Sequence, residues 1–150
     1  MTAILVLALA TIAMAADPFV GTWRLNPANS NLPPIQEKNL KSFIFKVENE
    51  NGRVRASNKI VNADGSITHS EWLGQFDGKD YPITGTPIYD MTSMKKMDAR
   101  TLEKVGKLAG KEVDRWRLVV SKDNKLLTCT TKLKAPNGQD ISITLVFDRQ

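Results

Sequence analysis

Short stretches of β-prone residues follow one another from Leu40 to the C-terminus, and turn signals separate them about every 8–12 residues. Four of these turns carry Asn-Gly or Asp-Gly pairs, which favour two-residue hairpins: Asn51-Gly52, Asp64-Gly65, Asp77-Gly78 and Asn137-Gly138. Connections of this length leave no room for the crossovers that parallel strands require. The chain is therefore predicted to form an antiparallel meander of roughly ten strands.

A meander removes its two exposed edges most completely when it closes on itself. We therefore expect an all-β, up-and-down antiparallel barrel of about 8–10 strands. The last stretch has the clearest alternation, because every second residue is apolar and the residues between are mostly polar. Its apolar positions, which predict the face turned to the core, are Ile141, Ile143, Leu145 and Phe147.

The first sixteen residues form an apolar run that ends in Ala13-Met14-Ala15-Ala16, a pattern typical of signal-peptidase cleavage. We expect residues 1–16 to be a signal peptide and residues 17–150 to be one exported domain, periplasmic or secreted. The run is shorter than the roughly 20 apolar residues of a transmembrane helix, and no cysteine stands directly after the cleavage site, where a lipoprotein anchor would need one. No stable membrane anchor is predicted.

The chain has one histidine, His69, and one cysteine, Cys129. A single cysteine forms no intramolecular disulfide, and a zinc site needs three or four protein ligands. We predict no metal, no cofactor and no enzymatic activity. A haem held by His69 and a nucleophilic pair of Cys129 with His69 are the alternatives. The favoured interpretation is that Cys129 packs as a small buried hydrophobe.

The net charge of +5 would suit an acidic partner, but charges of both signs alternate along most of the chain. Tryptophans can stack on nucleic-acid bases, yet no basic stripe lies between Trp23, Trp72 and Trp116. We therefore predict no nucleic-acid partner, and we expect the tryptophans to pack in the core.

Four stretches of the sequence carry a resemblance to a known family. They are DPFVGTWRLNP (17–27), DGKDYPITG (77–85), SMKKMDA (93–99) and SKDNKLLTCTT (121–131). Together they resemble a small exported bacterial lipocalin-like family of the calycin type, distantly similar to lipocalins and fatty-acid-binding proteins. In calycins an arginine of the last strand packs over a tryptophan of the first. The resemblance therefore implies a structural latch of Gly21, Trp23 and Arg149.

Residues 98–111 fit two patterns. Leu102, Val105 and Leu108 share one helical face, and a basic amphipathic helix there would suit an anionic membrane or partner. Gly106 and Gly110 oppose the helix, because each costs about 1 kcal/mol relative to alanine in a helix interior. The resemblance favours a hairpin.

A barrel of this size has room for one small ligand. We expect a monomer that binds a small apolar or amphipathic molecule, with polar contacts from His69, Glu71, Ser93 and Thr131. A surface ion pair is the simpler interpretation of His69 with Glu71. The alternative function is a protein-interaction module, such as a periplasmic protease inhibitor, that acts through an extended arm at residues 17–20 and the loop at 26–34.

Overall fold

The computed structural model describes residues 16–134 and 137–150, so the predicted signal peptide, apart from Ala16, lies outside the described residues. Ten strands are present in the described part of the chain, together with a 3₁₀ turn, η1 (Pro27–Asn29), and one short helix, α1 (Pro34–Asn39). The strands are β1 (Gly21–Leu25), β2 (Leu40–Glu50), β3 (Arg53–Asn62), β4 (Ile67–Gly74), β5 (Asp77–Thr84), β6 (Met91–Asp98), β7 (Thr101–Leu108), β8 (Lys111–Val120), β9 (Leu126–Lys134) and β10 (Asp140–Arg149).

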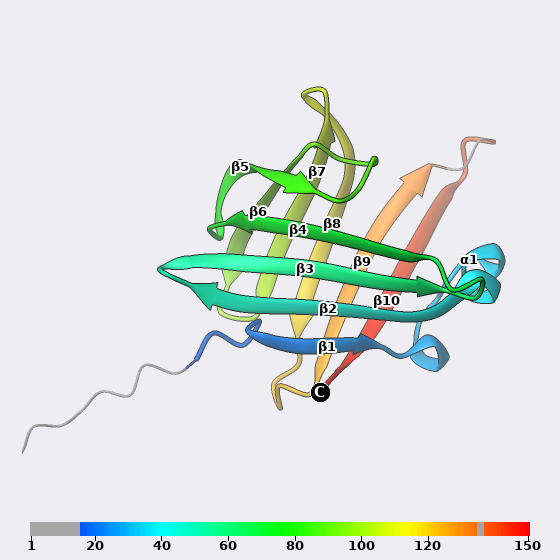
Figure 1. Cartoon of the computed structure of the whole chain (residues 1–150), viewed down its shortest axis with the longest axis horizontal. Helices are drawn as coiled ribbons and strands as arrows, with labels where there is room; N and C mark the ends of the chain where they lie inside the picture. The colour runs from blue at the N-terminus through cyan, green and yellow to red at the C-terminus, as the bar shows by residue number, and fades with distance from the viewer. Residues whose placement is uncertain (1–15, 135–136) are drawn as a thin grey trace, which may run out of the picture.

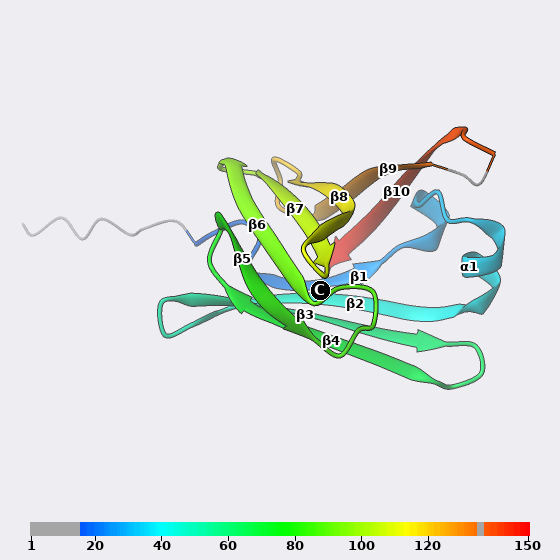
Figure 2. The same ribbon diagram turned by 90° about the horizontal axis from the view of Figure 1, so that it is seen from above.

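The strands form one closed antiparallel barrel. Consecutive strands pair all the way from β2 to β10, and β1 closes the barrel by pairing with both β2 and β10. In Figure 1, β1 to β4 run across the front while β7 to β10 cross behind them at a steep angle, so that the two sets enclose the interior (Figure 2). The predicted all-β, closed antiparallel barrel is confirmed.

The strand pairing of the barrel is shortest between β4 and β5. Only two residue pairs join these strands, Glu71 with Thr84 and Trp72 with Ile83. Pro82 lies in β5, where it has no N–H to donate, and the register with β6 shifts between Asp77 and Asp80. Pro82 therefore lies where the barrel has its shortest strand pairing.

Residues 98–111 form strands rather than a helix. β6 ends at Asp98, β7 follows from Thr101, and a turn at Ala109-Gly110 leads into β8. Both turn residues have positive φ, 49° for Ala109 and 76° for Gly110, as a tight hairpin of this hand requires. The hairpin is confirmed and the amphipathic helix is wrong. The short helix α1, at the other end of the chain, was not predicted from the sequence.

One end of the barrel is sealed by the residues before β1. Phe19 and Trp23 are both fully buried, and the Trp23 indole donates a hydrogen bond to the Phe19 carbonyl at 3.0 Å. Asp17 forms an ion pair with Lys96 of β6. Phe19 is therefore part of the packed core, and residues 17–20 lie against this end of the barrel instead of forming an extended arm.

Candidate ligand-binding cavity

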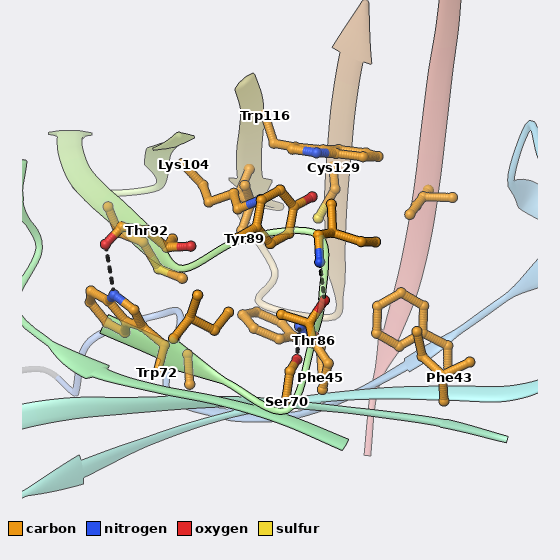
Figure 3. Close-up of a pocket in the computed structure, with 18 of the residues that line it drawn as sticks. Phe43, Phe45, Ser70, Trp72, Thr86, Tyr89, Thr92, Lys104, Trp116 and Cys129 are labelled. Carbon is orange, nitrogen blue, oxygen red and sulfur yellow. Dashed lines mark hydrogen bonds between the residues drawn. The ribbon is translucent and has the colours of Figure 1, made fainter. Parts of the chain in front are cut away.

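A cavity of ≈ 270 Å³ lies inside the barrel (Figure 3). Its walls are mainly apolar and aromatic because alternate residues of each strand point inward. On β10, Leu145 and Phe147 line the cavity as the alternation predicted, whereas Ile141 is 45% exposed. The apolar lining includes Phe43, Phe45, Ala56, Ile60, Trp72, Ile83, Met94, Leu118, Leu145 and Phe147.

The connection between β5 and β6 forms part of the cavity wall. It supplies Thr86, Ile88 and Tyr89, and the Ile88 N–H donates a hydrogen bond to the Thr86 hydroxyl at 3.2 Å. Gly85 begins this connection with a φ of 78°, and a Cβ there would lie 1.9 Å from the backbone oxygen of His69. Only glycine lets the chain pass this close to β4.

A buried polar cluster lies on the wall formed by β7 and β8. The Lys104 ammonium donates to Asp114 Oδ1 at 2.9 Å, and the Trp116 indole donates to Asp114 Oδ2 at 2.7 Å. The Tyr89 hydroxyl donates to the same Oδ2. The Lys104 Nζ also lies 3.8 Å from the centroid of the Tyr89 ring. Gly106 has no side chain and so leaves the space in which Tyr89 and Asp114 pack. Both Asp114 oxygens are thus occupied.

Burial and pairing act against each other on the pKa values of this cluster. Burial lowers the pKa of Lys104 more than the Asp114 carboxylate raises it. Burial also raises the pKa of Asp114, but the charge of Lys104 and three hydrogen bonds outweigh it, and the net pKa lies below its ordinary value. For Tyr89, burial and the bond to Asp114 both raise the pKa. At neutral pH the cluster therefore combines one cation, one anion and a neutral phenol.

Three further polar groups face the interior. Asn58 donates its amide to the Ser70 hydroxyl at 3.3 Å, and the Trp72 indole donates to the backbone oxygen of Thr92 at 2.9 Å. Thr92 is fully buried, and its hydroxyl oxygen has no hydrogen-bond partner among the described residues. A buried hydroxyl without a partner costs about 1–3 kcal/mol. This group therefore suits a bound molecule.

The predicted ligand residues do not gather in the cavity. His69 and Glu71 lie on the outer face of β4, where their side chains are 53% and 43% exposed and 3.2 Å apart. The expectation that they point inward is wrong, because Ser70 and Trp72 take the inward positions of that strand. Their pairing is the surface interaction that the simpler interpretation describes.

Ser93 and Thr131 are buried but do not line this cavity. Ser93 lies between the inward-facing Thr92 and Met94, so it points away from the interior. The Thr131 hydroxyl donates to the backbone oxygen of Arg115 at 2.6 Å and is thereby satisfied within the sheet. The cavity residues that were not predicted from the sequence are Thr92, Tyr89 and Lys104, and their bonding partner Asp114 was not predicted either.

The three residues of the predicted latch lie together at the sealed end of the barrel. The guanidinium of Arg149 covers the Trp23 ring and donates to the backbone oxygens of Val20 and Pro18 at 2.8 and 2.6 Å. A Cβ on Gly21 would lie 2.4 Å from the Arg149 Nη1. This group is separate from the residues that line the cavity.

Cys129 faces the cavity and is 7% exposed, and burial raises the pKa of its thiol to about 12. It cannot pair with His69, whose side chain points outward.

The described residues include no cluster of three or more His, Cys, Asp or Glu that could bind a metal ion. No described helix has the length and apolar character needed to cross a bilayer.

No protein-family model and no curated protein matches the sequence. Among solved structures, lobster apocrustacyanin A1 is similar, with a TM-score of 0.45 and 13% sequence identity. The alignment covers 91% of this chain and 63% of the lobster chain, so this chain spans less than two thirds of that protein's length. A similarity at this level assigns no family and no ligand. The barrel is established by its strand pairing.

Proposed function

We propose that this barrel is a non-enzymatic binding protein that holds one small, mostly apolar molecule in its interior. The observation that supports this most is the cavity of ≈ 270 Å³, whose walls are mainly apolar and carry a small number of polar groups. Such a lining is typical of small-molecule sites. A cavity of about 150 Å³ takes up benzene, so this one has room for a larger ring system or a short acyl chain.

Filling the cavity tests the proposal. Ala56 is 4% exposed and lines the cavity, so Ala56→Leu should reduce the space for a ligand. Ala63 is exposed in the turn after β3, and Ala63→Leu adds the same atoms outside the barrel. Calorimetric titration with a neutral naphthalene derivative should give binding to the wild type and Ala63→Leu and at least about tenfold weaker binding to Ala56→Leu. Equal binding to all three proteins would contradict an internal site.

Export and a monomeric state belong to the same proposal. The apolar run and the Ala-Met-Ala-Ala sequence of residues 1–16 support export. Mass spectrometry of protein recovered from the periplasm or medium should give an N-terminus at residue 16 or 17. An uncleaved chain that stays inside the cell would contradict export, and light scattering reports the oligomeric state.

A further inference from the structure

Thr92 places a buried hydroxyl at the cavity wall. The residue is fully buried, and its hydroxyl has no hydrogen-bond partner among the described residues. The backbone oxygen of Thr92 already accepts from the Trp72 indole, which fixes this part of β6 against β4. The hydroxyl can donate one hydrogen bond into the cavity.

Lys104 adds hydrogen-bond donors on the same wall. Thr92 pairs with Gly106 and Met94 pairs with Lys104, so Thr92 and Lys104 are diagonal neighbours on the inner face of the sheet. Asp114 takes one ammonium hydrogen of Lys104, and an ammonium has three. Both Asp114 oxygens, in contrast, already accept hydrogen bonds from residues of the cluster. The Thr92 hydroxyl and the Lys104 ammonium are therefore the donors of this wall, and a ligand that matches them carries a hydrogen-bond acceptor.

The charge in the cavity is balanced before any ligand enters. The titratable groups that face it or bond to that wall are Lys104, Asp114, Tyr89 and Cys129. Lys104 and Asp114 are opposite in charge and 2.9 Å apart, and the phenol and the thiol are neutral. A carboxylate ligand would be an additional anion without its own counter-ion, which is unfavourable in a buried site. An uncharged ligand meets no such penalty.

We propose that the cavity selects an uncharged molecule that carries a single hydrogen-bond acceptor, such as a carbonyl on a ring system. This selection rests on the proposed function of the barrel as a small-molecule binder. Thr92 recognises this acceptor, with Lys104 as the second donor. Phe45, Trp72 and Leu118 enclose the apolar part of the molecule. The ligand class is thus a neutral ketone, aldehyde or ester rather than a fatty acid or another organic anion.

Three naphthalenes of nearly equal shape test this selection by calorimetric titration. Acetylnaphthalene carries a carbonyl, isopropenylnaphthalene replaces its oxygen with carbon, and naphthoate is an anion at neutral pH. We expect acetylnaphthalene to bind at least about fivefold more tightly than either of the others, because only it satisfies the buried donors without adding charge. In Thr92→Val, which keeps the shape of the side chain, this preference over isopropenylnaphthalene should disappear.

Thr128→Val is the matched control, because it removes the same hydroxyl from a half-buried residue of β9 that does not line the cavity. It should keep the preference. Binding of all three compounds with equal affinity, or tightest binding of naphthoate, would overturn the selection and leave the proposed function intact. Binding of none would overturn both. The role of Thr92 would be overturned if Thr92→Val unfolded in urea like the wild type and still preferred acetylnaphthalene to isopropenylnaphthalene.

Discussion

The guanidinium carbon of Arg149 lies 4.1 Å from the centroid of the Trp23 ring, which places the end of the last strand over the first. The same guanidinium donates to the backbone oxygens of Pro18, Val20 and Asn124. One side chain therefore joins the segment before β1, the β8–β9 turn and β10. Closure of the barrel depends on this junction, since β1 and β10 share only three residue pairs.

Removing the Arg149 side chain should weaken the whole barrel. Arg149→Ala removes three hydrogen bonds and the contact with the Trp23 ring, and we expect a loss of about 2–4 kcal/mol in the free energy of unfolding. Arg149→Lys should lose less of the free energy of unfolding than Arg149→Ala but should not match the wild type, because an ammonium lacks the planar fork that reaches several carbonyls. Urea unfolding followed by tryptophan fluorescence measures both.

Arg24→Ala is the matched control for this variant. Arg24 lies in β1 and pairs with β10, as Trp23 does, but its side chain is exposed. Its loss should therefore change the free energy of unfolding by less than about 0.5 kcal/mol. Equal stabilities of Arg149→Ala and Arg24→Ala would show that the latch contributes nothing.

Gly21→Ala should disturb the same junction from the other side. Gly21 has a φ of 147°, and the added Cβ would meet the Arg149 Nη1 at 2.4 Å. We expect a loss of about 2 kcal/mol or more from the strained backbone and the displaced guanidinium. The loss should be smaller in an Arg149→Ala background, because only the backbone strain remains. A double-mutant cycle in urea that gives strictly additive losses would contradict this contact.

Asp114→Asn should destabilise the protein by about 3 kcal/mol, because it leaves the buried charge of Lys104 without a counter-ion. The double variant Lys104→Met with Asp114→Asn should be more stable than Asp114→Asn alone, because it removes that unpaired charge. Asparagine still offers an oxygen to Tyr89 and Trp116. A double variant that is less stable than the single one would refute the pairing as the cause.

The contribution of Asp114 should also depend on pH. Its pKa in the folded protein lies below its ordinary value of 3.8, so the folded state binds the proton less readily than the unfolded chain. The stabilisation is then complete above about pH 5 and is lost as the pH falls through the folded pKa. The difference in stability between the wild type and Asp114→Asn should narrow below about pH 4. A constant difference between about pH 7 and pH 3 would contradict the shift.

Cys129 provides a reporter of the cavity, because it is the only thiol in the sequence. Burial raises its pKa to about 12, so it should react with a thiol reagent at about pH 8 at least about a hundredfold more slowly than in the urea-unfolded chain. A ligand in the cavity should slow the reaction further, since Cys129 lines it. A native rate equal to the unfolded rate, or no effect of a bound ligand, would contradict this placement.

The barrel could be predicted from the sequence because hairpin turns and alternation are local. In β10 four of the five bulky apolar residues fall on one parity, with Val146 the exception, so the inward face was clear. In β4 it was not, because Ile67 and Leu73 share the parity of His69 and compete with Trp72. The fully buried side chain is Trp72, while Ile67 is 60% exposed. Following Trp72 alone would have placed Thr68 and Ser70 inside.

The polar cluster of the cavity was missed for two reasons. Lys104 looked like one of several surface lysines, although it shares the strand parity of the buried Leu102. Asp114 likewise shares the parity of Trp116 and Leu118 on β8. Tyr89 belongs to a connection without a regular period, and its contact with Asp114 joins residues 25 apart in sequence. Such a contact follows from closure of the barrel and from no local pattern.

The crystal structure of the complex with acetylnaphthalene tests the central claim most directly. The account predicts electron density for one molecule inside the barrel between Phe45, Trp72 and Leu118, with the carbonyl oxygen within hydrogen-bond distance of the Thr92 hydroxyl. An interior filled by side chains, with the compound on the outer surface or absent, would contradict it.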